Sequence, residues 1–356
     1  MKITVLFNPK KITILYTMYP FWISKFRKEF LFTTDLEWVK KSDKNKKLLL
    51  IGWFSGQDKE GLHKQLLELL SNKYEAISYF DDNDGTESHY LDLLKYFKIY
   101  YKKQVFFDRQ NYLLDFYGNR IFTDYYHRRL GITEAPLPKS LPKVEKPEYL
   151  SKIKVSWNLA YGQYPISKHK RFLARLLFKW TGEEFMKYIF SSNIIHKQLP
   201  QPNVLKCQAR FGFKGYRTSV GFQRKMFLEK IAGNDLFLRG QIPFEEYNKE
   251  IKNVSAILSP FGWGEICFRD FEAILNGSVL VKPNMDHVQT WPNVYISNQT
   301  YLPVEWDGSN LESQVSSLFE NDSIMNEMRT KAWETLRQGY FQMDEKIVEI
   351  LEDFGR

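Results

Sequence analysis

Two glycines in the segment Ser259–Glu265 could bring backbone N–H groups close to an anionic ligand. Gly262 and Gly264 follow an apolar run at 255–259 and precede an amphipathic stretch at 266–276. The run predicts a buried strand, and the stretch predicts a helix. Ligands of parallel α/β sheets bind beyond the carboxyl ends of the strands, where the N-terminus of a helix favours a phosphate. Two glycines before a helix are also common in ordinary turns, so the pattern alone leaves both interpretations open.

Glu272 lies on the helix predicted after this loop, inside the segment Arg269–Gly277. A carboxylate at this position can accept hydrogen bonds from both hydroxyl groups of a ribose. The alternative is a solvated helix glutamate, which is the usual state of this residue type. A ribose acceptor beside a phosphate loop would favour a nucleotide as the ligand.

The segment Gly240–Val281 resembles the donor-binding half of GT-B glycosyltransferases. Glu272-Ala273, followed by Gly277, is similar to the signature of glycosyltransferase family 4. The segment Arg269–Ala273, which has the pattern Arg-x-x-Glu-Ala, also resembles the exostosin-like enzymes of family 47. This resemblance covers residues 203–340 and implies a nucleotide-sugar site with Glu272 on the ribose. Its donor-binding residues would be Gly262, Trp263, Gly264, Arg269 and Glu272.

The segment Ala209–Gly215 is similar to the Gly-Arg … Lys-Gly loop of family 4, which implies that Arg210 and Lys214 hold the donor diphosphate. Both side chains supply charge-assisted hydrogen bonds to phosphate oxygens. The resemblance also implies that Glu265 is a catalytic residue facing the donor sugar. Six residues separate Glu265 from Glu272, where the family has seven. One residue turns a side chain by about 100° on a helix, so the loop must absorb the difference if Glu265 keeps this role.

The acidic segment Asp81–Gly85 follows a predicted strand and therefore lies at the ligand end of its sheet. It could be a solvated turn that caps the next helix. It could supply Asp84 as the general base that deprotonates an acceptor hydroxyl. In a metal-dependent transferase, Asp82 and Asp84 would instead form an Asp-x-Asp site for a divalent ion. We favour Asp84 as the base, with no metal, because the donor signature lies in the other half of the chain.

The segment Asp115–Arg129 is dense in aromatic and polar residues. One interpretation is a buried aromatic cluster. The other is an acceptor pocket, because sugars bind by stacking and by hydrogen bonds in one plane. The acceptor-binding residues would then be Tyr117, Arg120, Asp124 and His127.

Alternating strands and helices must position these groups. Residues 47–53 form an apolar run typical of a buried parallel strand, and the leucines of 59–72 recur at helical spacing. Strands are also predicted at 74–80 and 99–107, with a helix near 87–97 between them. Such alternation predicts a doubly wound α/β domain.

A second alternation begins after the proline-containing segment Leu199–Pro202, which we interpret as a hinge. The two alternations predict an α/β fold class with two doubly wound Rossmann-like domains and a cleft between them, and the resemblance implies that this arrangement is of GT-B type. The resemblance further implies an acceptor-side domain at 1–199, a donor-binding domain at 203–338, and a C-terminal helix at 339–356 that crosses back to the first domain.

The composition is that of a basic globular protein. Its 356 residues carry a formal net charge of +9, which favours an anionic partner. The basic stretch 167–190 could pack on the sheet or make a peripheral contact with an anionic membrane. The two cysteines lack partners at metal-ligand spacing, which argues against a structural metal site. No apolar run reaches the roughly 18 residues that span a bilayer. The N-terminal segment predicts a strand and not a secretory signal. We therefore expect a cytoplasmic protein, at the inner face of a membrane if that contact forms.

These features predict a glycosyltransferase that needs no metal or other cofactor. Its donor would be a UDP- or GDP-linked sugar, and its acceptor a hydroxyl group of a glycan or a lipid-linked glycan. Stereochemistry stays open, because the family-4 likeness favours retention while an aspartate base favours inversion. A basic nucleic-acid-binding protein is the alternative from another class. It explains the charge and the aromatic residues, but the sequence contains no recognised binding module, and we expect no nucleic-acid partner.

Overall fold

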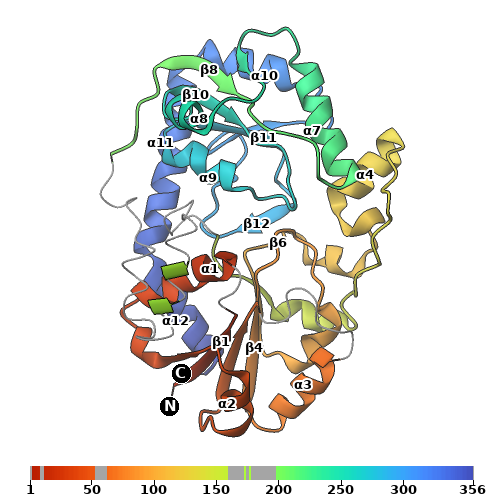
Figure 1. Ribbon diagram of the computed structural model, residues 1–356, viewed down its shortest axis with the longest axis vertical. Coiled ribbons are helices and arrows are strands. Elements are labelled where there is room, and N and C mark those ends of the chain that lie inside the picture. Colours follow the sequence, from red (N-terminus) through yellow and green to blue (C-terminus); the bar gives the residue numbers. More distant parts are fainter. Residues whose placement is uncertain are drawn as a thin grey trace.

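The computed structural model describes residues 2–8, 12–52, 62–158, 172–173, 176–177 and 198–355. These residues form two lobes, one above the other in Figure 1, each built on a parallel sheet. The first lobe holds residues up to 158, and the second holds residues from 204 to 341. Most of the predicted basic stretch 167–190 lies outside the described residues.

The first sheet has six parallel strands in the order β2-β1-β3-β4-β5-β7. Its central strand β3 carries the predicted apolar run, and Leu48–Ile51 is fully buried because helices cover both faces. The strands are β1 (Ile3–Phe7), β2 (Phe30–Thr33), β3 (Lys47–Ile51), β4 (Ala76–Asp81), β5 (Tyr100–Lys102) and β7 (Ile153–Val155). The α-helices of this lobe are α1 (Ile12–Ile23), α2 (Leu36–Lys41), α3 (Leu62–Ser71) and α4 (Ile121–Leu130).

The second sheet has five parallel strands in the order β13-β11-β10-β8-β9. In both sheets the second strand lies on one side of the first and the later strands lie on the other. This confirms the predicted fold class of two doubly wound α/β units. The strands are β8 (Val204–Gln208), β9 (Phe237–Leu238), β10 (Val254–Leu258), β11 (Val279–Pro283) and β13 (Leu302–Val304). The helices are α7 (Thr218–Lys230), α8 (Phe244–Glu250), α9 (Phe268–Leu275), α10 (Leu311–Phe319) and α11 (Asp322–Phe341).

Two predicted elements of the first lobe differ from the structure. The helix expected near 87–97 is only a short 3-10 helix, η2 (Leu91–Tyr96). The strand expected at 99–107 is divided into β5 and β6 (Gln104–Phe106). The division arises because β6 leaves the first sheet and pairs antiparallel with β12 (Val288–Thr290) of the second lobe. This two-stranded ribbon lies between the lobes in Figure 1.

The last helix, α12 (Met343–Asp353), packs on the first lobe, and both chain ends lie close together there (Figure 1). The Tyr101 hydroxyl donates to Asp353 Oδ2 at 2.8 Å, and the Ser24 hydroxyl donates to Asp344 Oδ1 at 2.6 Å. The chain thus returns from the second lobe to the first where α11 ends and α12 begins.

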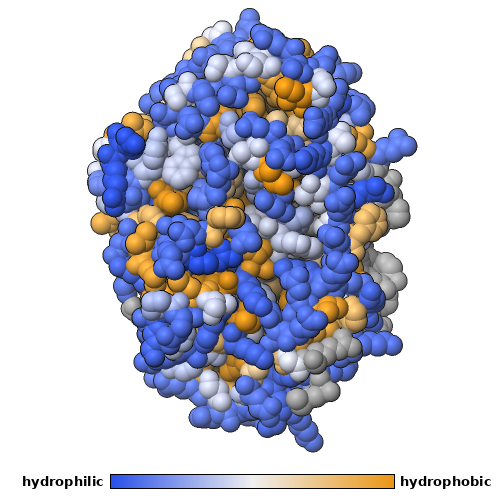
Figure 2. All heavy atoms as spheres, turned by 180° about the vertical axis from the view of Figure 1, so that it is seen from behind, coloured by the Kyte–Doolittle hydropathy of each residue, from blue (hydrophilic) through white to orange (hydrophobic). Residues whose placement is uncertain are grey.

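On the rear face, hydrophilic residues surround separate apolar patches (Figure 2). Within the described part of the chain, no helix has both the length and the apolar character needed to cross a membrane.

Candidate functional site

A cavity of about 260 Å³ opens beyond the carboxyl ends of β8 and β10. These neighbouring strands flank the point where the strand order of the second sheet reverses, which is where doubly wound sheets bind ligands. Most of the lining comes from the predicted glycine loop and the first turn of α9. The lining residues are Asp84, Tyr216, Arg224, Ser259, Pro260, Gly262, Trp263, Gly264, Ile266, Cys267, Phe268, Arg269 and Phe271.

The buried carboxylate of Asp270 fixes the loop that lines the cavity. It accepts hydrogen bonds from the Cys267 backbone N–H at 3.0 Å and from the Ser259 hydroxyl at 2.5 Å. It also pairs with the Lys282 ammonium at 3.1 Å and accepts from the Tyr295 hydroxyl at 2.8 Å. These contacts join the end of β10, the start of α9 and the end of β11, so the loop is held in place from several sides.

Two guanidinium groups give the cavity its positive charge. Arg224 is buried and lies 4.5 Å from the centre of the Tyr216 ring, and it donates to the carbonyls of Gly212 and Phe261 at 2.6 and 2.8 Å. Burial lowers the pKa of Arg224, but a guanidinium stays charged in proteins. Arg269 donates from Nη2 to a backbone carbonyl, while its buried Nη1 has no hydrogen-bond partner within the described residues. The pair is suited to an anionic ligand such as a diphosphate.

Arg210 and Lys214 do not line this cavity, although the resemblance predicts that they hold the diphosphate. The Arg210 guanidinium is held by Glu250 of α8, with Nη2–Oε2 at 2.7 Å and Nε–Oε1 at 3.0 Å. Lys214 is exposed in the loop before α7. The arginines that line the cavity are Arg224 and Arg269, and the role of Arg210 and Lys214 in holding the diphosphate stays a prediction.

Trp263 lines the cavity, whereas Glu272 is not among its lining residues. Glu272 is one turn beyond Arg269 on α9, so both residues share one face of the helix. The Glu272 carboxylate accepts a hydrogen bond from the Tyr247 hydroxyl at 3.0 Å. The Trp263 ring is 52% exposed and its centre lies 5.5 Å from that of Tyr216, which leaves one side of the indole available for stacking.

Glu265 does not face the cavity as the resemblance predicts, because its carboxylate is fully buried between the lobes. It accepts hydrogen bonds from the Thr86 backbone N–H at 3.0 Å, the Thr86 hydroxyl at 2.6 Å and the Gln104 amide at 3.1 Å. His287 Nε2 lies 3.8 Å from the same carboxylate. Burial opposes the charge of Glu265, but His287 and the bonds from Thr86 outweigh it and lower its pKa to about 2. Glu265 thus joins the two lobes.

Gly264 brings the first lobe to the cavity. A Cβ atom at this position would lie 1.7 Å from the carbonyl oxygen of Asp84, so only glycine allows the two backbones to touch. The neighbouring Gly262 is also confined, since a Cβ there would lie 3.0 Å from the Cys267 sulfur. The contact at Gly264 makes Asp84 part of the cavity wall.

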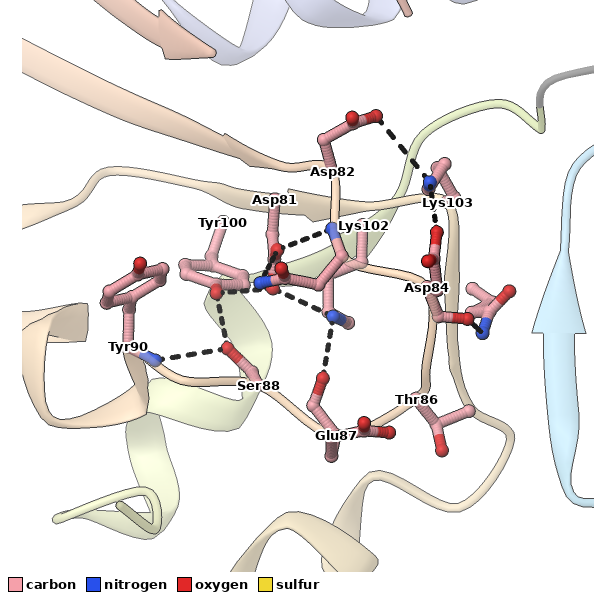
Figure 3. A network of polar contacts seen from close by, with 12 residues as sticks. Asp81, Asp82, Asp84, Thr86, Glu87, Ser88, Tyr90, Tyr100, Lys102 and Lys103 are labelled. Carbon is pink, nitrogen blue, oxygen red and sulfur yellow. Dashed lines mark hydrogen bonds and ion pairs between the residues drawn. The ribbon is translucent and has the colours of Figure 1, made fainter. Parts of the chain in front are cut away.

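The three aspartates of the acidic turn have different surroundings (Figure 3). Asp81 is buried and accepts from Lys102 Nζ at 2.8 Å and from the Tyr100 hydroxyl at 2.7 Å. Asp82 is also buried and accepts from Thr17 of α1, whereas the side chain of Asp84 is 53% exposed. Asp84 is therefore the aspartate of this turn that can meet a ligand.

The Asp-x-Asp alternative for a metal does not fit this turn. The Lys103 ammonium lies between the two carboxylates, 3.6 Å from Asp82 and 3.5 Å from Asp84 (Figure 3). A second cation placed between them would be repelled. The described residues contain no group of three or more His, Cys, Asp or Glu side chains that could hold a metal ion.

The predicted acceptor residues lie together on η4 (Tyr117–Asn119) and α4, and their partners lie within or beside this cluster. The Tyr117 and His127 rings stack with centres 3.6 Å apart, and Asp124 accepts from the Tyr117 backbone N–H at 2.9 Å. Arg120 pairs with Glu87 at 2.8 Å. None of the four predicted residues lines the 260 Å³ cavity. The cluster packs beside the contact between α4 and α7. The role of these four residues in acceptor binding therefore stays a prediction.

Several residues of the site carry no local signal in the sequence. Thr86, Lys103, Gln104 and His287 come together only where the lobes meet. Arg224 lies on α7 at helical spacing from the buried Val220 and Phe227, so the signal in the sequence is a cation on the apolar face of a helix.

No family model and no curated protein matches this chain. Its fold is similar to several solved structures over nearly the whole length of both chains. One is a glycosyltransferase from Rickettsia africae, with 10% identity, 100% of this chain and 99% of that chain covered, and a TM-score of 0.47. Another is an alpha-glucosyltransferase in complex with UDP, with 11% identity, 99% of this chain and 100% of that chain covered, and a TM-score of 0.41. A third is HepE from Anabaena in complex with UDP, with 11% identity, 99% of this chain and 100% of that chain covered, and a TM-score of 0.43.

Proposed function

We propose that this protein is a glycosyltransferase that moves a sugar from a nucleotide diphosphate donor to a hydroxyl group. The observation that carries the proposal is the cavity at the switch point of the second sheet, where two arginines, a glycine loop and the first turn of α9 converge. This combination suits a diphosphate, because guanidinium groups and helix N-termini both stabilise phosphate oxygens.

The donor would lie along the cavity with its diphosphate on Arg224 and Arg269. Glu272, oriented by Tyr247, would accept hydrogen bonds from the ribose, and Trp263 would stack on a ring of the donor. Gly262 and Gly264 would allow the backbone to approach the ligand. The arginines would stabilise the leaving diphosphate, so we propose a reaction that needs no metal.

Asp84 is the candidate base for the acceptor. Among the described residues that line the cavity, it is the one carboxylate, and its side chain is half exposed. A general base must reach the acceptor hydroxyl directly, and this position on the cavity wall allows it. Transfer with inversion would follow, and the anomeric configuration of the product would test it.

For the acceptor we propose a hydroxyl of a glycan or a lipid-linked glycan, bound on the first-lobe side of the cavity. The peripheral membrane contact through residues 167–190 and a cytoplasmic location stay proposals that rest on the sequence.

The release of nucleoside diphosphate from a panel of UDP- and GDP-linked sugars, with a chelator present, tests this function. We expect turnover of at least one donor. Arg269→Ala should raise the KM for that donor about 10- to 100-fold, which corresponds to about 1.5–3 kcal/mol for a hydrogen bond to a charged group.

Lys225→Ala is the matched control, because this exposed lysine of the second lobe pairs with Glu229 on its own helix. Its KM should stay at the wild-type value. Salt-sensitive binding to RNA without release from any donor would instead support the nucleic-acid-binding alternative.

A further inference from the structure

Lys103 is a buried cation beside the proposed site. It lies between β5 and β6, and its side chain is 5% exposed. Its ammonium is 3.6 Å from Asp82 and 3.5 Å from Asp84, and it has no hydrogen-bond acceptor within the part of the chain that the structure describes. A buried ammonium without a close acceptor is costly, so its charge must be balanced by the two carboxylates.

Each residue of the segment Lys102–Gln104 forms an ion pair or a hydrogen bond with the acidic turn Asp81–Gly85. Lys102 pairs with Asp81 at 2.8 Å, and Lys103 lies between Asp82 and Asp84 (Figure 3). The Gln104 amide donates to the Asp84 carbonyl and to Glu265 of the second lobe. Each residue of this segment therefore holds a different part of the turn.

We propose that Lys103 is a positioning residue for the reaction, and that it holds the Asp84 carboxylate in place on the cavity wall. The proposal rests on the proposed function, in which Asp84 is the base. Because the Lys103 nitrogen is inaccessible to solvent, it acts through Asp84 and does not touch a substrate. Asp82 completes the arrangement, since it balances the remaining charge and is anchored on α1 by the Thr17 hydroxyl.

The electrostatics support this role. Burial opposes the charge on Lys103, but Asp82 and Asp84 outweigh it and raise its pKa, so the ammonium stays charged beside Asp84. Other charged or titratable groups that face the turn are His89, Tyr100, Lys102, Glu265 and His287, with Arg224 and Arg269 across the cavity. Lys103 is the cation within ion-pair distance of the Asp84 carboxylate among the described residues.

The test is the titration of the Asp84 carboxyl carbon, followed by NMR in protein labelled with carbon-13 at aspartate. The Asp84 signal is assigned by its loss in Asp84→Asn. We expect Lys103→Met to raise the proton affinity of Asp84 about tenfold, because an opposite charge at this distance favours the ionised carboxylate. Lys103→Arg should restore the wild-type titration, and Lys98→Met, which removes an exposed lysine before β5, should leave it unchanged.

Lys103→Met leaves Asp82 buried without its cation, so a second comparison keeps the test independent of folding. Asp82→Asn/Lys103→Met removes both charges of the buried pair, and Asp82→Asn alone is its control. Equal Asp84 titrations in these two proteins would overturn the proposal, whereas a tenfold difference would support it.

Activity gives an independent measure. The acidic limb of kcat/KM against pH should move to higher pH in Lys103→Met, while a structural role alone would lower the rate equally at every pH. Absence of donor turnover in the wild-type protein would contradict the proposed function, but the NMR titration would still decide the role of Lys103.

Discussion

At the scale of single residues, Gly264 makes the contact between the lobes possible. The backbone of Asp84 occupies the space where a side chain would begin, and Gly264 does not need a positive φ. The position therefore requires glycine because a side chain would collide with the Asp84 backbone. The backbone conformation itself is one that other residues can adopt.

Gly264→Ala should lower the free energy of unfolding by about 1–3 kcal/mol, because a methyl group forces the Asp84 backbone away. Gly212→Ala is the matched control, since a Cβ there meets no atom within 4 Å and its φ is also ordinary. Urea unfolding measures both. Equal midpoints for the two variants would contradict the contact between Gly264 and Asp84.

Glu265 makes the stability of the protein depend on pH. Its pKa of about 2 in the folded protein lies below the ordinary value of 4.5, so the ionised carboxylate stabilises the fold. This contribution is complete above pH 4.5 and is lost as the pH falls from 4.5 through 2, and it amounts to about 3 kcal/mol.

Unfolding measured between pH 5 and pH 2 checks this. The wild-type protein should lose stability more steeply than Glu265→Gln, which cannot titrate. Identical slopes for the two proteins would show that His287 and Thr86 do not stabilise the ionised carboxylate.

The sequence predicted part of this site. The loop with Gly262 and Gly264 and the position of Arg269 followed from the strand and helix around them. The sequence could not show that Glu250 of α8 holds the Arg210 guanidinium. It also could not show that Glu265 is buried between the lobes, because its partners, Thr86 and Gln104, lie about 160 residues or more away in the chain.

At the scale of elements, α7 begins on a carboxylate from the other lobe. Glu134 accepts from the backbone N–H groups of Thr218 and Ser219, both at 3.0 Å, and from the Ser219 hydroxyl. The first turn of α7 thus finds its hydrogen-bond acceptor in the segment that follows α4.

Glu134→Ala should lower the free energy of unfolding by about 1–2 kcal/mol, because it leaves N–H groups at a helix start without an acceptor. Glu148→Ala, at an exposed glutamate with a 4.0 Å ion pair, is the control and should have little effect. Chemical unfolding separates them, and a neutral result for Glu134→Ala would contradict the cap.

The element pattern was largely predictable, and the exceptions have a common cause. Apolar runs and helical spacing located β3, β10 and α9 to within a few residues. The expected strand 99–107 was divided because Gln104–Phe106 pairs with Val288–Thr290, a partner that local sequence cannot reveal.

At the scale of the whole molecule, the two sheets were predicted, but the way the lobes are joined was not. The ribbon of β6 and β12, the buried Glu265 and the contact between the Phe122 and Phe261 rings all connect parts far apart in the sequence. Together they bring the acidic turn of the first lobe against the cavity of the second.

The most direct test of the central claim is whether a nucleoside diphosphate binds this cavity. UDP and GDP are the probes, because the sequence predicts a donor sugar linked to one of these two nucleotides. Thermal unfolding of wild-type protein with UDP or GDP should show stabilisation of about 2.7 kcal/mol at 100 times Kd. Glu272→Ala should lose it, while Glu229→Ala, at an exposed helix glutamate, should keep it. Stabilisation by neither nucleotide, or equal stabilisation of wild type and Glu272→Ala, would contradict the account.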